Sequence, residues 1–182
     1  MQKLNSKKLR ISNPTSEEIA KLKRNDIYII LDNVLDTYNI GAVFRLADAV
    51  AAKKIYLCGG SETPPNSRIQ KASIGTWQWV PWEYCKTAVH AIDKLKQENS
   101  LTKAVAIELI ENSIPYTSYD YPLPIALIIG HETNGVSAET IQRCDAVVEL
   151  PMFGINISMN TMVSLGIVLF EAIEKNSLQP SV

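Results

Sequence analysis

Five short apolar runs constrain the fold of this chain more than any other feature. The first, DIYIILDN (26–33), is β-branched and apolar at successive positions, which is typical of a strand buried on both faces of a parallel sheet. The others are KKIYLCG (53–59), KAVAIEL (103–109), PIALIIG (124–130) and AVVEL (146–150). Segments with helical patterns separate most of these runs, at about 39–52, 87–98, 137–144 and 157–175. This alternation predicts one α/β domain with a parallel sheet flanked by helices.

Two further segments complete the expected secondary structure. NPTSEEIAKLKR (13–24) predicts a short helix, because Thr15 or Ser16 can cap it and acidic residues fill its first turn. The Pro-, Ser- and aromatic-rich segment 61–85 is expected to be mostly loop, with a short strand near 80–84.

Composition excludes several classes of protein. The chain has 182 residues, 46% of them hydrophobic and 20% charged, which fits a soluble globular domain. Its most apolar run, TMVSLGIVLFEAI (161–173), is too short to span a membrane, and no apolar signal core follows the basic N-terminus. The three widely spaced cysteines indicate neither a disulfide framework nor a zinc site. We therefore expect a cytoplasmic protein without a bound metal.

The charge distribution is uneven, although the net charge is only −1. Residues 1–24 contain seven basic and two acidic side chains, which leaves a net charge of +5 on this arm and −6 on the rest. Such an arm could follow a phosphate backbone, or it could simply be a solvated terminus.

Three loops that follow predicted strands combine Gly with polar side chains. They are LDTYNIGAVFR (35–45), GHETNGVS (130–137) and PMFGINISMN (151–160). Ligands of open parallel sheets bind outside the carboxyl ends of the strands, although turns and helix caps use the same residue types. No GxGxxG, Walker or GxSxG motif is present, and His131 beside Glu132 is too small a group for a metal site.

Taken in order, these loops resemble the motifs of one family, the SpoU class (TrmH-like) of RNA 2′-O-ribose methyltransferases in the SPOUT superfamily. The resemblance covers roughly residues 26–175. The sequence departs from the family at His131 (usually Asn), at Met159 (usually Leu), in "NTM" after Ser158, and at Thr37–Tyr38, where a Pro is frequent. The matching residues are Asn39, Gly41 and Arg45, then Gly130, Glu132 and Gly135, then Pro151, Met152, Gly154, Ser158 and Asn160.

The resemblance implies a fold, a cofactor and an assembly. It implies a deep C-terminal trefoil knot, a homodimer, and S-adenosylmethionine bound against the second and third motif loops. Residues 1–24 would then form a basic arm with a short helix, 25–176 the methyltransferase domain and 177–182 a tail. The cofactor-binding residues implied are Ile107, Gly130, Leu150, Met152 and Ser158.

The same resemblance nominates catalytic residues, namely Arg45, Asn39, Glu132, Ser158 and Asn160. Because a guanidinium stays protonated, we expect Arg45 to stabilise the developing alkoxide or hold a phosphate, although a role as base is the alternative. Asn39 could hold Arg45 or cap its helix, and Glu132 could orient Asn39 or pair with Arg45. Ser158 and Asn160 could cap the last helix, contact ligands, or do both.

The expected substrate is RNA, and compact members of the family often act on tRNA. Ribosomal RNA is the alternative, as is a non-catalytic dimer that binds RNA or nucleotides. Trp77, Trp79 and Trp82 could stack on bases or belong to the core or a dimer interface. The basic residues expected to contact RNA are Lys7, Lys8, Arg10, Arg24, Arg68 and Lys71.

Overall fold

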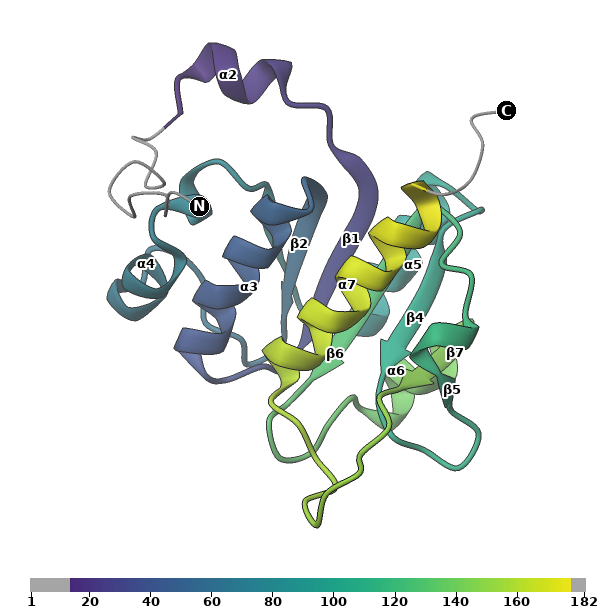
Figure 1. Cartoon of the computed structure of the whole chain (residues 1–182). Helices are drawn as coiled ribbons and strands as arrows, with labels where there is room; N and C mark the ends of the chain where they lie inside the picture. The colour runs from purple at the N-terminus through teal and green to yellow at the C-terminus, as the bar shows by residue number, and fades with distance from the viewer. Residues whose placement is uncertain (1–13, 178–182) are drawn as a thin grey trace, which may run out of the picture.

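The protein is built on a parallel sheet, as expected, with seven strands, of which the two-residue strand at 114–115 was not predicted. The computed structural model describes residues 14–177, and Figure 1 shows the sheet with helices on both sides. The strand order is β3-β2-β1-β6-β4-β7-β5, and every pairing is parallel. The strands are β1 (Asn25–Asp32), β2 (Ala52–Cys58), β3 (Trp82–Cys85), β4 (Lys103–Ile107), β5 (Ile114–Pro115), β6 (Ile125–Gly130) and β7 (Ala146–Glu149).

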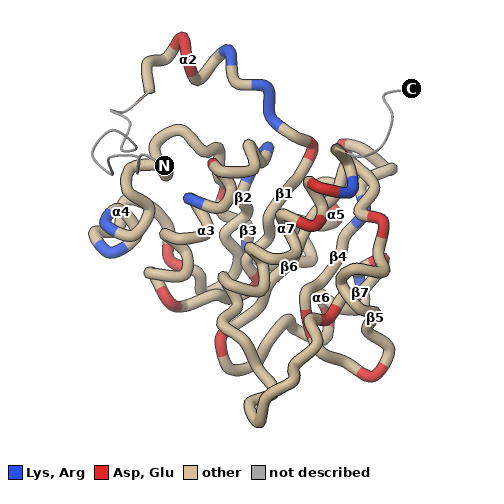
Figure 2. The backbone as a smooth tube through the Cα atoms, in the orientation of Figure 1, with Lys and Arg blue, Asp and Glu red and all other residues tan. Residues whose placement is uncertain are grey.

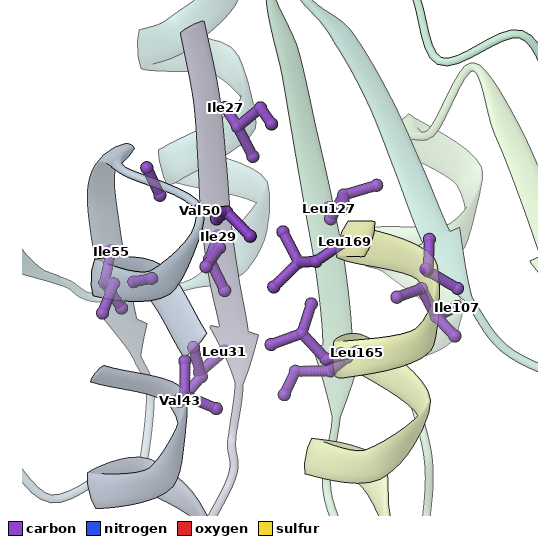
Figure 3. Packing of buried hydrophobic residues seen from close by; sticks show 14 of the residues in the cluster. Ile27, Ile29, Leu31, Val43, Val50, Ile55, Ile107, Leu127, Leu165 and Leu169 are labelled. Carbon is purple, nitrogen blue, oxygen red and sulfur yellow. The ribbon is translucent and has the colours of Figure 1, made fainter. Parts of the chain in front are cut away.

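Helices cover the two faces of the sheet in separate layers. α3 (Thr37–Ala49) and α7 (Thr161–Ser177) pack on one face, where Ile27, Ile29 and Leu31 of β1 point (Figure 3). α5 (Ala88–Glu98) and α6 (Ala138–Arg143) cover the other face, to which Ile30 belongs. Because successive strand residues face opposite sides, β1 needs apolar residues at nearly every position. This requirement explains the continuous apolar run in the sequence.

The order of the strands brings distant loops together at one edge. The last residues of β1 and β6, Asp32 and Gly130, are register partners, and Ile107 at the end of β4 pairs with Val148 of β7. The carboxyl ends of these four central strands therefore lie side by side. The chain reverses its direction of winding between β1 and β6, which is the position where open α/β sheets bind ligands.

The segment expected to be mostly loop contains a helix, α4 (Ser67–Ser73), so that expectation was wrong for these residues. The Asn66 side chain caps this helix by accepting from the N–H groups of Arg68 and Ile69. α4 packs closely on α3 because Gly41 lacks a side chain: a Cβ there would lie 2.5 Å from the Ala72 Cβ. The motif glycine in α3 therefore serves helix packing. The short strand near residue 80 is confirmed as β3, and η1 (Thr76–Gln78) precedes it.

The last helix begins at Thr161 rather than near Ile157. The Asn160 Oδ1 atom accepts hydrogen bonds from the N–H groups of Met162 and Val163, which is the geometry of an N-cap. Residues 151–160 therefore form an extended loop, which projects below the sheet in Figure 1.

The remaining expectations concern the first helix and the tryptophans. α2 (Ser16–Lys21) is capped by Thr15, one of the two caps that the sequence allowed, and Thr15 and Glu18 form a capping box. The three tryptophans are partly buried against the core, and the Trp79 Nε1 atom donates to Asp48 at 2.7 Å.

A short 3₁₀ segment, η2 (Tyr116–Ser118), follows β5. Within residues 14–177 no helix is both long and apolar enough to cross a membrane. The knot and the cytoplasmic location stay predictions.

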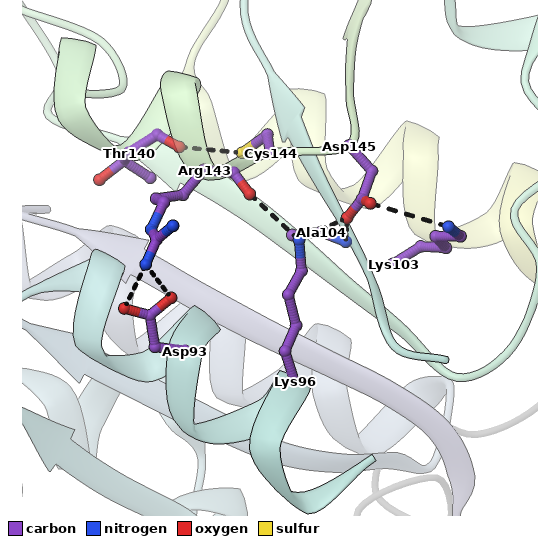
Figure 4. A network of polar contacts seen from close by, with 8 residues as sticks. All are labelled: Asp93, Lys96, Lys103, Ala104, Thr140, Arg143, Cys144 and Asp145. Atoms are coloured by element: carbon purple, nitrogen blue, oxygen red, sulfur yellow. Dashed lines mark hydrogen bonds and ion pairs between the residues drawn. The ribbon is translucent and has the colours of Figure 1, made fainter. Parts of the chain in front are cut away.

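A network of charged side chains ties α5 and α6 to the amino ends of β4 and β7 (Figure 4). Arg143 of α6 pairs with Asp93 of α5 at 2.9 Å. Asp145, just before β7, accepts from the Ala104 N–H at 2.8 Å and pairs with Lys96 at 2.9 Å. This network lies opposite the strand ends where the motif loops meet.

Candidate active site

The loops that follow β4, β6 and β7 surround a cleft at the carboxyl edge of the sheet. All five residues predicted to bind the cofactor line this cleft: Ile107, Gly130, Leu150, Met152 and Ser158. They lie at the end of β4, at the end of β6 and in the segment after β7, with each group at least 20 positions from the next along the sequence. Their role in cofactor binding stays a prediction, but the fold brings the whole set together.

A chain of hydrogen bonds joins the three motifs beside this cleft. The Glu132 Oε1 atom accepts from the Asn39 side-chain amide at 3.1 Å. The Asn39 Oδ1 atom in turn accepts from the Asn160 side-chain amide at 3.1 Å. Asn39 is only 6% exposed, so both ends of its amide need these partners. Glu132 therefore orients Asn39, whereas Asp36, not Asn39, caps α3 by accepting from the Tyr38 N–H.

Glu132 also fastens the loop after β1 to the loop after β6. Its carboxylate accepts from the backbone N–H groups of Leu35 at 3.1 Å and Asp36 at 2.9 Å. Burial alone would raise the pKa of Glu132, but these N–H groups and the Asn39 amide outweigh it and lower that pKa. The carboxylate is therefore ionised at neutral pH without any cationic partner among the described residues.

Two more carboxylates, those of Asp32 and Glu108, bind the loop after β6. The Glu108 Oε2 atom accepts from the Val136 N–H at 2.9 Å. Asp32, which is 3% exposed, accepts from both the N–H and the hydroxyl of Ser137. The loop between β6 and α6 is thus anchored at its far end by strand ends on either side of β6.

Close backbone packing within this loop depends on two glycines. A Cβ at Gly130 would lie 2.1 Å from the Gly135 carbonyl carbon, and one at Gly135 would lie 2.1 Å from the Glu108 Oε2 atom. Gly135 also has a φ of +67°, which side-chain-bearing residues rarely adopt. The second motif therefore requires both glycines for steric reasons.

The third motif loop is exposed, and its polar residues have different tasks. The Ser158 Oγ atom donates to the Asn156 Oδ1 atom at 3.3 Å and faces the cleft, so it does not cap α7. The proposed capping role applies to Asn160 alone. Phe153 and Ile155 are almost fully exposed, at 95% and 103%.

Arg45 is not among the residues that line the cleft. It is exposed on α3, and its side chain makes no hydrogen bond or ion pair with any described residue, so neither Asn39 nor Glu132 holds it in this structure. Its catalytic role stays a prediction. A guanidinium without intramolecular partners is available to a bound polyanion.

The predicted RNA-binding residues differ in exposure and in the hydrogen bonds that their side chains already make. Arg68 and Lys71 are exposed on α4, beside the helix that carries Arg45, and Figure 2 shows this basic helix. The Arg24 guanidinium donates to the carbonyls of Ala52 at 3.1 Å and Trp79 at 2.7 Å, and burial lowers its pKa. An RNA contact by Arg24 would have to compete with these bonds. Lys7, Lys8 and Arg10 lie outside the described residues.

Several lining residues were not predicted from the sequence. Glu108, Glu149 and His131 line the cleft together with Thr161 and Ser164. The signal for the first three was position, because each lies at or just after the carboxyl end of a strand. No lysine or arginine belongs to the cleft as the described residues form it.

The chain is similar in sequence to known RNA methyltransferases. Residues 26–170 match the SpoU rRNA Methylase family. A tRNA (guanosine(18)-2′-O)-methyltransferase of Aquifex aeolicus is 31% identical over 157 residues, which are 85% of this chain and 72% of that protein. A 23S rRNA (guanosine-2′-O-)-methyltransferase of Ralstonia nicotianae is 30% identical over 155 residues, which are 85% of this chain and 61% of that protein.

A solved structure resembles the fold described above. The AdoMet-bound rRNA methyltransferase from Sinorhizobium meliloti superposes with a TM-score of 0.76 and 29% sequence identity. The match covers 87% of this chain and 59% of that one, so this chain spans little more than half of it. The family match extends from β1 to α7 and includes all three motif loops. The chain therefore belongs to the SpoU rRNA Methylase family.

Proposed function

We propose that this protein transfers a methyl group from S-adenosylmethionine to a ribose 2′-OH of RNA. One observation carries the proposal: Asn39, Glu132 and Asn160, from three separate motifs, form one hydrogen-bonded chain beside the cleft. Curated relatives with this activity support the same reaction.

The residues of the cleft fit the cofactor chemically. Adenosine needs an apolar slot with a few backbone partners, and Ile107, Leu150 and Met152 supply apolar side chains on loops. The cofactor is a cation, and the cleft contains carboxylates but no lysine or arginine among the described residues. When bound, it supplies a methyl group that is already activated by its sulfonium. Gly130 and Ser158 would contribute backbone and hydroxyl contacts.

The protein's own task is to orient the ribose and to help remove its proton. Arg45 stabilises the alkoxide that develops as the 2′-OH loses its proton, or holds the adjoining phosphate. Asn39, Glu132 and Asn160 fix the start of α3 and the start of α7, which carry the residues around the reacting group.

The substrate class is RNA, and within it we propose tRNA. The Aquifex relative acts on tRNA and the Ralstonia relative on 23S rRNA, so both are compared directly in the test. Basic residues on α4 and in the N-terminal arm supply the backbone contacts.

We further propose a homodimer. Phe153, Ile155 and Ile157 of the third motif loop are exposed, and so are Val163 and Phe170 of α7. Exposed apolar side chains on neighbouring segments are typical of an interface. Light scattering after size exclusion should give twice the chain mass of 20.2 kDa, and a monomeric mass would contradict the dimer.

The reaction is tested with labelled cofactor and either bulk tRNA or rRNA. A 2′-O-methyl group blocks alkaline cleavage, so the product should contain an alkali-resistant labelled dinucleotide. Label only on bases would contradict the ribose assignment, and label only in rRNA would contradict the choice of tRNA. Calorimetry should show that wild type and Arg45→Ala bind S-adenosylmethionine equally, while only wild type methylates. Absence of binding by wild type would overturn the proposed function.

A further inference from the structure

His131 occupies an unusual position in the turn after β6. Its Nδ1 atom accepts hydrogen bonds from the backbone N–H groups of Thr133 at 3.0 Å and Asn134 at 3.3 Å. The backbones of His131 and Gly135 also bond to each other twice, at 3.0 and 2.8 Å. Four hydrogen bonds therefore close this turn, and two of them end on one ring nitrogen.

The turn held in this way is a wall of the cleft. Gly130, His131, Thr133 and Gly135 all line it. Thr133 and Asn134 are exposed, so apolar packing does not hold the tip of the turn. Its two ends are anchored by the carboxylates described above, at Glu132 and at Val136. Between them, the ring of His131 accepts from the backbone N–H groups of both residues at the tip.

The acceptor role fixes the chemical state of the ring. A nitrogen that accepts N–H bonds must use its lone pair, so this geometry requires the tautomer whose proton is on Nε2. The Nδ1 atom of histidine and the Oδ1 atom of asparagine are both three bonds from Cα. Asparagine can therefore accept from N–H groups two and three residues later, as it does in Asx turns, whereas alanine cannot.

We propose that His131 is a positioning residue for the cofactor, which orders the 131–135 turn through its Nδ1 atom before the ligand arrives. This inference rests on the proposed function for the identity of the ligand. The ring acts through the backbone of Thr133 and Asn134, not through the reacting atoms.

The first test compares His131→Ala with His131→Asn. His131→Ala should raise the KM for S-adenosylmethionine and its dissociation constant roughly five- to tenfold, the effect of about one net hydrogen bond, and leave kcat within about twofold. His131→Asn should bind the cofactor within about twofold of wild type. An unchanged KM in the alanine variant, or an asparagine variant that behaves like alanine, would overturn the inference.

The second test reads the ring directly and needs no cofactor. Nitrogen-15 NMR of wild type should show an unprotonated Nδ1 and a protonated Nε2 for His131. The chain has two histidines, so His90→Gln assigns the signal. A proton on Nδ1 would overturn the inference. If wild type shows the expected ring state but binds no S-adenosylmethionine, the proposed function fails instead, and the turn loses its assigned ligand.

Discussion

The two edges of the parallel sheet hold negative charge in different ways. At the amino edge, Asp145 and Asp93 pair with Lys96 and Arg143 (Figure 4). At the carboxyl edge, three carboxylates accept only from backbone N–H groups, a hydroxyl and side-chain amides. These are Asp32, Glu108 and Glu132.

This difference separates a structural network from the proposed binding site. Ion pairs at the amino edge neutralise charge and tie two helices to the sheet. At the carboxyl edge, neutral dipoles stabilise the Glu132 carboxylate without cancelling its charge, and Glu108 and Glu149 also line the cleft, so we expect a negative potential there. A cationic ligand gains from such a field, whereas it would gain little from the paired charges of the other edge.

The largest expected effect comes from adding one methyl group at the carboxyl edge. Gly130→Ala places a Cβ within 2.2 Å of the Gly135 and Val136 backbone, so the turn must move. We expect a loss of about 1–3 kcal/mol in the free energy of unfolding, and no measurable cofactor binding. Urea denaturation and calorimetry measure the two quantities.

Gly154→Ala is the matched control for this change. No atom lies within 4 Å of a Cβ built at Gly154, in the exposed third motif loop. Its free energy of unfolding should stay within about 0.5 kcal/mol of wild type. Equal losses in both variants would show that glycine conformational freedom, not close packing at the cleft, controls stability.

The next effect follows from breaking the chain of hydrogen bonds between motifs. Asn39→Ala removes the buried amide that joins Glu132 to Asn160, and it should cost about 1–3 kcal/mol of unfolding free energy. Asn39→Asp keeps the size but sets a second negative charge against Glu132, so it should cost at least as much at pH 7. An aspartate variant as stable as wild type would mean that the carboxyl edge carries no uncompensated charge.

Asn39 also shows what sequence can and cannot provide. The apolar runs predicted the parallel sheet. Of the three Gly-containing loops, those after β6 and β7 line the cleft, whereas the loop after β1 does not and the end of β4 takes its place. The sequence left open whether Asn39 caps α3, holds Arg45 or is oriented by Glu132. The answer depends on a contact between Asn39 and Glu132, which lie 93 residues apart in the sequence. Only the register of β1 with β6 decides it, by placing Asp32 beside Gly130.

Other differences have local causes that a pattern of residue types does not reveal. α4 was missed because its stability depends on packing against Gly41, while Pro and Ser around it suggest a loop. The start of α7 was placed too early because Ile157 continues its apolar pattern, whereas the Asn160 cap sets the true start. Glu108 was missed because its bonds go to backbone N–H groups that no sequence motif marks.

A smaller loss of unfolding free energy, about 1 kcal/mol at neutral pH, is expected when one carboxylate is replaced by its amide at either edge. The losses at the two edges should respond differently to salt. Asp145→Asn breaks ion pairs with Lys96 and Lys103. The resulting loss of unfolding free energy should therefore shrink in 1 M NaCl, where the Debye length is about 3 Å. Glu132→Gln removes bonds to neutral dipoles, so its cost should persist. Urea denaturation at low and high salt compares them. The same salt response in both variants would remove the distinction between the edges.

The unfolding free energy should also depend on pH through the same two carboxylates, Glu132 and Asp145. Burial opposes ionisation of both, yet hydrogen bonds lower the pKa of Glu132 below 4.5, and the Ala104 N–H with Lys96 lowers that of Asp145 below 3.8. A lowered folded-state pKa stabilises the protein above the ordinary value, and this stability is lost as the pH falls through the folded-state pKa. The slope of unfolding free energy against pH below about 4.5 should therefore be shallower in Glu132→Gln than in wild type. An unchanged slope would contradict this account.

The smallest effect is expected at the amino edge, where Arg143→Ala breaks the ion pair with Asp93. Both side chains are partly exposed, at 55% and 34%, so solvent screens the pair and its loss should cost about 0.2–1 kcal/mol. Cofactor affinity should not change, because Arg143 lies at the end of α6 away from the cleft. A variant with normal stability but weaker cofactor binding would connect the two edges through α6. The negative field of the cleft would then depend on charges at the amino edge as well.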